Sequence, residues 1–335
     1  MKTTKRFWTI CVLAVVFVLS FAFAACDTDT PTPTPPDNTD KPNWTLNSPD
    51  GKVKADIYFA NGQISYTVTK DGVAVVEKSN LGMATDQCEF VDLTFVSEQT
   101  SEDTISYTNI TGKTKQVTTS YKQNVLTFAE GDYLLDVVFR TYNDGYAFRY
   151  NIRKADESTG DFTVTDELTH FALPQNAKTY AMAVVTNVGV LGGGAYYSYE
   201  DKYQYRSYKN LGDEQLGFPV MYSVKNGDEE VYSLISESDI YGRDYHGSAL
   251  QKDGNDGLKT IHMPACGTDA AMTASYPFTS PWRVAVVGGL DTIVESTLVE
   301  DVYDEVEPWK PDDYDSLSEE EKQIYTYDWV RPGAA

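Results

Sequence analysis

Short runs in which apolar and polar residues alternate recur along the chain from Trp44 onward. In residues 62–69 every second residue is apolar, as expected for a strand with one buried face. Asp71-Gly72 then separates this run from residues 73–76, which predicts a hairpin closed by a type I′ turn. Comparable runs follow at 93–96, 133–139, 146–152, 181–185, 220–224, 232–235 and 284–287. So many strands joined by short turns predict an all-β fold, a large antiparallel β-sandwich.

Composition supports this fold class and excludes one class of partner. The chain has 335 residues, 24 of them tyrosine, and 13% are aromatic, which favours strands over helices. The formal net charge is −23. Since no basic stretch is present to neutralise phosphates, we expect no nucleic-acid partner.

The N-terminus has the pattern of an export signal. Three basic residues precede an apolar run over residues 7–25, and Ala24-Ala25-Cys26 closes it. This pattern predicts a lipoprotein signal peptide over residues 1–25, with Cys26 as the lipidated residue. The run is also long enough to span a bilayer, so an uncleaved anchor is the alternative. Both alternatives export the domain and tether it to a membrane, and we expect a lipid-anchored protein of the bacterial cell envelope.

Residues 26–43 are rich in proline, threonine and aspartate and predict an extended spacer. Export permits a disulfide between Cys88 and Cys266, although the sequence does not show whether they meet. Residues 300–328 hold 12 acids, and Ser318-x-x-Glu321 predicts one capped short helix there. We therefore expect a folded domain over residues 44–308 and an acidic linker over 309–335, which leads into a further domain.

The strand near residue 235 ends on a carboxylate, Glu237. A charge at the end of an apolar strand is costly to bury without a partner, which could be an arginine such as Arg243 or a metal ion. Asp239 and Asp244 follow within eight residues, and such a cluster suits calcium, which takes several oxygen ligands. The simpler interpretation is a polar loop at the rim of the sandwich, and spacing alone favours it.

Other candidate motifs have structural explanations. Gly192-Gly193-Gly194 lacks the lysine and helix pattern of a phosphate-binding loop. Residues 253–257, Asp-Gly-Asn-Asp-Gly, have no closing glutamate for a calcium loop and predict a hairpin turn. The three histidines, His170, His246 and His262, have no metal-binding spacing.

Several stretches, in order, resemble the N-terminal domain of glycoside hydrolase family 97. They are Ser48-Pro49-Asp50-Gly51-Lys52, Ser79-Asn80-Leu81-Gly82, Asn143-Asp144-Gly145-Tyr146-Ala147-Phe148-Arg149-Tyr150, the pair of expected closing strands Ser280-Pro281-Trp282-Arg283-Val284 and Leu290 to Leu298, and Trp329-x-x-Pro332-Gly333. The last of these is similar to the joint at which that domain passes into a catalytic barrel.

The resemblance implies a β-supersandwich like that of galactose mutarotases, packed on a (β/α)₈ barrel. It further implies cleavage of α-glycosidic bonds with calcium, where the barrel supplies the catalytic groups and the sandwich lends one glutamate to the metal. Glu237 stands at that glutamate's position, in Ile235-Ser236-Glu237-Ser238, with Ser236 where the family usually has histidine. Tyr245 and His246 are the candidate sugar-facing residues. No catalytic residue is assigned within this chain.

Three functional hypotheses remain open at this point. The chain is the N-terminal domain of a lipid-anchored α-glycosidase, whose partners are an α-linked oligo- or polysaccharide and the barrel. Alternatively, it is a stand-alone sugar-binding surface lipoprotein that uses tyrosines between Ala195 and Tyr208. The third hypothesis is an enzyme like an aldose epimerase, with Glu237 and His246 as acid and base.

Overall fold

The structure is a computed structural model that describes residues 41–109, 113–188, 195–198, 201–240, 245–254, 257–262, 272–303, 310–311 and 313–326. The chain divides into two compact units, Met1–Thr34 and Pro35–Ala335, and every described residue lies in the second. None of the helices formed by these residues has the length and apolar character needed to cross a membrane. The expected signal peptide, Cys26 and nearly all of the spacer lie outside the described residues.

The smaller sheets of the described chain are antiparallel. One has the order β1-β2-β3-β4 and a second the order β20-β10-β5, while β13 and β14 form a two-stranded ribbon. Their bounds are β1 Trp44–Asn47, β2 Val53–Ala60, β3 Gln63–Lys70, β4 Val73–Leu81, β5 Met83–Thr85, β10 Gly160–Glu167, β13 Val185–Val188, β14 Ala195–Ser198 and β20 Met272–Tyr276.

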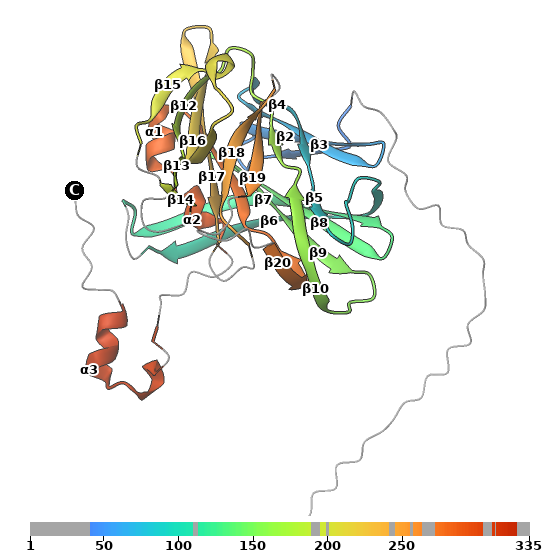
Figure 1. The fold of residues 1–335 in the computed structure, drawn as a ribbon. Coiled ribbons are helices and arrows are strands. Elements are labelled where there is room, and N and C mark those ends of the chain that lie inside the picture. The colour runs from blue at the N-terminus through green and yellow to red at the C-terminus, as the bar shows by residue number, and fades with distance from the viewer. Residues whose placement is uncertain are drawn as a thin grey trace, which may run out of the picture. The chain divides into compact units, whose positions relative to one another are not determined.

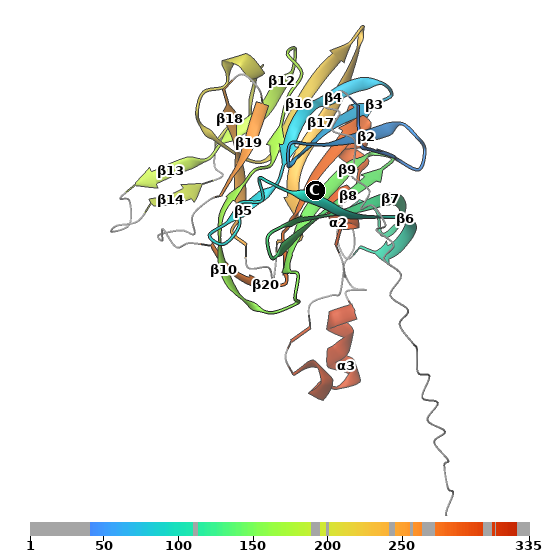
Figure 2. The ribbon, with the colours of Figure 1, turned by 90° about the vertical axis from the view of Figure 1, so that its right-hand side faces the viewer.

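The large sheet of the described chain has the order β11-β19-β18-β16-β17-β22-β9-β8-β7-β6, with β12, β15 and β21 joined to it at the side (Figures 1 and 2). Its strands are β6 Thr94–Thr108, β7 Gln116–Glu130, β8 Tyr133–Tyr142, β9 Gly145–Lys154, β11 His170–Phe171, β12 Lys178–Ala183, β15 Gln204–Ser207, β16 Gln215–Asn226, β17 Glu229–Ser238, β18 Ser248–Asp253, β19 Gly257–His262, β21 Phe278–Thr279 and β22 Trp282–Gly288. The predicted all-β sandwich class is confirmed.

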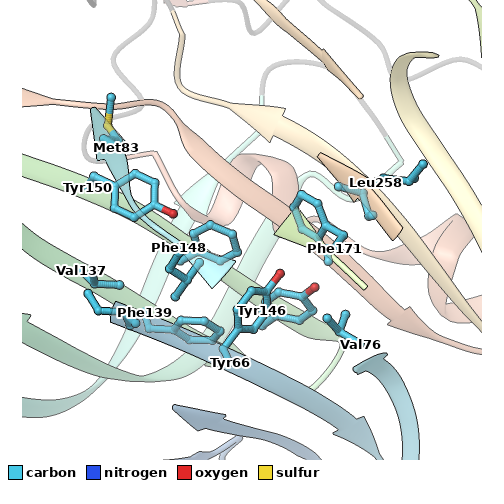
Figure 3. Packing of buried hydrophobic residues seen from close by; sticks show 14 of the residues in the cluster. Tyr66, Val76, Met83, Val137, Phe139, Tyr146, Phe148, Tyr150, Phe171 and Leu258 are labelled. Atoms are coloured by element: carbon cyan, nitrogen blue, oxygen red, sulfur yellow. The ribbon is translucent and has the colours of Figure 1, made fainter. Parts of the chain in front are cut away.

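The main core fills the space between the four-stranded sheet and the large sheet. Tyr66 of β3 is fully buried and meets the rings of Phe139, Tyr146 and Phe148 from β8 and β9 at centroid distances of 5.4 to 6.2 Å (Figure 3). Aromatic side chains bury large areas and favour tilted contacts of this kind. The alternating apolar residues of the two sheets thus join them face to face.

Two turns explain how neighbouring strands are joined. Asp71 and Gly72 have φ values of +50° and +81°, and positive φ at both central residues is the mark of the type I′ turn that was predicted. The second turn joins β8 to β9, and Gly145, the first residue of β9, has no room for a side chain. A Cβ there would lie 2.1 Å from the carbonyl oxygen of Ala285 and 2.6 Å from Leu298 Cδ2. Only glycine lets β9 approach β22 this closely.

The expected closing strand at Leu290 to Leu298 is wrong. These residues form α1, Leu290–Glu295, and enter α2, Leu298–Asp301. Their apolar residues, Leu290, Ile293 and Val294, repeat at three and four positions, which is the helical period rather than that of a strand. Ile293 and Val299 pack on a second apolar cluster, on the face of the large sheet away from the main core.

The remaining helical turns are η1 Tyr208–Asn210, η2 Tyr314–Ser316, α3 Glu319–Lys322 and η3 Gln323–Thr326. The predicted capping box is confirmed: Ser318 Oγ accepts from Glu321 N, and the Glu321 carboxylate accepts from Ser318 N. Cys88 carries a buried free thiol. Cys266, with which export would permit a disulfide, lies outside the described residues.

Candidate functional site

Glu237 lies near the end of β17, directly opposite Arg283 of β22 in the strand register. Arg283 Nη1 donates to Glu237 Oε2 at 2.7 Å, and the side chains are 2% and 11% exposed. The charge at the end of the apolar strand therefore has the arginine partner that its burial requires. That partner is Arg283, while Arg243 lies outside the described residues.

A second carboxylate shares the same guanidinium. Glu167, at the end of β10, accepts from Arg283 Nε at 2.8 Å and from Nη2 at 2.5 Å, which is the paired geometry of arginine with carboxylate. Its side chain is 1% exposed. One buried arginine thus joins three strands, β10, β17 and β22, through two carboxylates.

Polar groups from neighbouring segments complete the network. Arg283 Nη2 also donates to Ser248 Oγ at 2.8 Å, and the Ser248 N–H donates to Glu237 Oε1 at 3.2 Å. The Tyr245 hydroxyl donates to Glu167 Oε2 and lies 2.7 Å from His262 Nε2. The network fixes the orientation of both carboxylates, because each accepts from more than one donor.

The two carboxylates differ in their electrostatics. Burial alone would raise the pKa of Glu167, but the charge and hydrogen bonds of Arg283 outweigh it and lower that pKa to about 2. Burial raises the pKa of Glu237, and its single bond from Arg283 and the Ser248 N–H only partly oppose this. Burial also lowers the pKa of His262. Glu167 is therefore the more firmly ionised partner of Arg283.

Of the two acids that follow Glu237 in the predicted cluster, the structure describes Asp239. Asp239 has φ +58° and its Oδ2 lies 3.9 Å from Arg149 Nη1, while Asp244 lies outside the described residues. Within the described ranges, no three His, Cys, Asp or Glu side chains are placed to hold a metal ion together. Glu237 itself fits a calcium ligand, since among the described residues the donor to its Oε1 is a backbone N–H, that of Ser248. The Glu237 carboxylate could therefore supply one ligand to a calcium site whose other ligands come from elsewhere.

Tyr245 and His246 lie in the segment before β18. Tyr245 is 6% exposed and its hydroxyl faces Glu167, whereas His246 is half-buried and its backbone N–H lies 3.1 Å from Met272 Sδ. In the described structure the contacts of Glu237 run to Arg283 and Ser248.

A cleft of about 630 Å³ has Glu167 among its lining residues. Its polar lining includes Lys78, Asn80, Thr169, Asp253 and Lys259. Its volume lies in the range of small-molecule sites. Glu237, Tyr245 and His246 are not among its described lining residues, so the cleft is separate from the site that the sequence predicted.

The sequence did not identify Glu167, Ser248 or His262, and it named Arg283 only within a motif. One local signal was available: Arg283 interrupts an otherwise apolar strand, Trp282-Arg283-Val284-Ala285-Val286. A charge within such a strand predicts a buried ion pair. Glu167 carries no comparable signal, because it lies 116 residues from Arg283 in the chain.

Residues 46–304 match the model of the family described as Glycosyl-hydrolase 97 N-terminal. The chain is similar to the "Probable retaining alpha-galactosidase" of Streptomyces bingchenggensis, with 24% identity over 87% of this chain and 40% of that protein. It is similar to the "Retaining alpha-galactosidase" of Bacteroides thetaiotaomicron, with 24% identity over 76% of this chain and 40% of that protein.

Two solved structures share the fold. One is a variant of a Glycoside Hydrolase Family 97 enzyme from Pseudoalteromonas sp. strain K8, with TM-score 0.65, 22% identity, and coverage of 80% of this chain and 38% of that one. The other is a beta-arabinopyranosidase, with TM-score 0.69, 25% identity, and coverage of 80% and 44%. The chain spans about 40% of the length of the curated relatives it matches.

Proposed function

Because this chain belongs to the Glycosyl-hydrolase 97 N-terminal family, we propose that it is the accessory domain of a calcium-dependent α-glycosidase. In this proposal the chain lends Glu237 to a calcium ion whose other ligands come from a (β/α)₈ barrel. The observation that carries it is the position of Glu237: a carboxylate oriented by Arg283, with Oε1 accepting, among the described residues, from the Ser248 backbone N–H. Bound calcium would join the Glu237 carboxylate to the ligands that the barrel supplies.

The catalytic groups are proposed to come from the barrel. Hydrolysis of a glycosidic bond uses two carboxyl groups on either side of that bond. In the described network, Glu167 and Glu237 both accept from one arginine, which holds them as a structural pair. What this chain would contribute is therefore a metal ligand and a wall of the sugar site, with Tyr245 and His246 as its candidate sugar-facing residues.

Anchoring belongs to the same proposal. The basic start, the apolar run and Ala24-Ala25-Cys26 support export and lipidation at Cys26. Residues 26–43 would then hold the domain away from the membrane. An α-glycosidase held in this way would act on oligosaccharides at the cell envelope.

The experiment joins this chain to a family barrel and measures hydrolysis of aryl α-glycosides against calcium concentration. We expect activity that rises with calcium, and a higher calcium requirement in Glu237→Gln. Activity that is independent of both calcium and Glu237 would contradict the proposal.

One observation favours a second function, sugar binding without a barrel. Tyr203 and Tyr205 are 53% and 52% exposed, and Tyr205 stacks on Tyr180 at 4.5 Å between centroids. Exposed aromatic rings of this kind can stack on sugar rings. Titration of the chain with α-linked oligosaccharides tests it: binding that Tyr205→Ala removes supports this function, and no binding contradicts it.

A further inference from the structure

The network around Arg283 is asymmetric between its two carboxylates. Glu167 takes two donors of the guanidinium, Nε and Nη2, and is 1% exposed. Glu237 takes one donor, Nη1, and is 11% exposed. Arginine binds a carboxylate best through a planar pair of N–H groups, so Glu167 is its main partner. Glu237 is the outer, less committed member.

The charges of the three described groups contribute to what a cation would meet at Glu237. Glu167, Arg283 and Glu237 contribute −1, +1 and −1, a net −1 at neutral pH. Without Glu167, the pair Arg283 and Glu237 would be neutral, and the guanidinium would repel a cation at Glu237. Because Glu167 offsets Arg283, Glu237 can be held by an arginine and still attract a cation.

We propose that Arg283 and Glu167 are positioning residues for Glu237, with Arg283 orienting its carboxylate and Glu167 cancelling the arginine's charge. The inference rests on the proposed function, since Glu237 is taken as the calcium ligand. Ser248 belongs to the same arrangement, because it accepts from Arg283 through Oγ and donates to Glu237 through its N–H. The backbone N–H of Ser248 therefore reports directly on the Glu237 carboxylate.

The experiment is a calcium titration of the full chain, followed by NMR at the Ser248 amide. Glu167→Gln keeps the size of the side chain and removes its charge. We expect calcium affinity at this amide to fall about tenfold, the effect of one lost charge near a divalent ion. Glu167→Asp keeps the charge, and we expect it to stay within about twofold of the wild type by the same reasoning.

Arg283→Lys tests the orienting role separately. Lysine keeps the positive charge but lacks the planar fork that holds both carboxylates. We expect weaker calcium binding in this variant although the net charge is unchanged. Arg283→Lys is also a second test in case Glu167→Gln does not fold. Circular dichroism will show whether each variant folds.

A matched control uses another arginine–carboxylate pair. Asp136→Asn removes one charge from the pair Asp136–Arg153, whose Oδ1 and Nη2 lie 3.3 Å apart on β8 and β9. We expect it to leave calcium binding at Ser248 unchanged. One outcome would overturn the positioning roles but not the proposed function. In that outcome Glu237→Gln loses calcium binding, while folded Glu167→Gln and Arg283→Lys bind calcium with wild-type affinity. Unchanged binding in Glu237→Gln would overturn the proposed function itself.

Discussion

Arg283 and Glu237 are direct neighbours across two antiparallel strands, and the guanidinium Nη1 lies 2.7 Å from Glu237 Oε2. The same guanidinium is bound on its other edge by Glu167. The family's candidate metal ligand is therefore held from within this domain.

Acid should weaken the fold through Glu167. Its pKa falls from an ordinary 4.5 to about 2 on folding. A lowered pKa contributes stability that is present above about pH 4.5 and is lost as the pH falls toward 2. The shift corresponds to about 3 kcal/mol. Urea unfolding between pH 7 and pH 3 should show a smaller loss of stability in Glu167→Gln than in the wild type; equal losses would contradict the assignment.

Gly145→Ala should destabilise the domain, because its Cβ would meet the backbone carbonyl of Ala285. Overpacking against backbone costs roughly 1–3 kcal/mol, and we expect the upper end here. Gly247→Ala is the control, since its Cβ would lie 3.7 Å from Glu237 Oε1, an ordinary contact. Thermal unfolding distinguishes the two: similar melting temperatures would show that β9 can move away from β22.

The purified chain alone should not hydrolyse aryl α-glucosides or α-galactosides, with or without calcium. The reason is that the two catalytic carboxyl groups are proposed to come from the barrel, whereas Glu167 and Glu237 share one arginine as a structural pair. Release of the chromogenic aglycone is the measurement. Turnover that disappears in Glu237→Gln or His246→Ala would instead support an enzyme like an epimerase or another activity within this domain.

Cys26→Ser should block lipidation and alter processing, because Ala24-Ala25-Cys26 is the candidate cleavage and acylation sequence. Metabolic labelling with a fatty acid and cell fractionation provide the measurement. A wild-type protein recovered from cells as soluble and unlabelled would rule out this mode of anchoring.

Local patterns were sufficient to predict most of the fold. The alternation of apolar and polar residues predicted the strands. Asp71-Gly72 predicted a turn, and the capping box at Ser318 predicted the start of a helix. The prediction of a closing strand at Leu290 to Leu298 was wrong because it rested on resemblance, whereas the apolar spacing of this segment is helical.

The site was only partly predictable, for a physical reason. The end of an apolar strand marked Glu237 as a charge in need of a partner, and the resemblance to the family made it the candidate metal ligand. Its connection to Glu167 depends on contacts between residues 116 positions apart, which no local pattern encodes. The partner of a buried charge is fixed by tertiary packing, so the arginine had to be found in the structure.

A calcium titration of the chain, alone and joined to a family barrel, tests the central claim most directly. Calcium needs six to eight oxygen ligands, so a single carboxylate should bind alone only weakly, on the order of 10⁻³ M. Binding should tighten with the barrel, weaken in Glu237→Gln, and stay unchanged in Asp256→Asn. Micromolar binding by the isolated chain that Glu237→Gln removes, or binding with the barrel that Glu237→Gln leaves intact, would contradict a calcium site shared through Glu237.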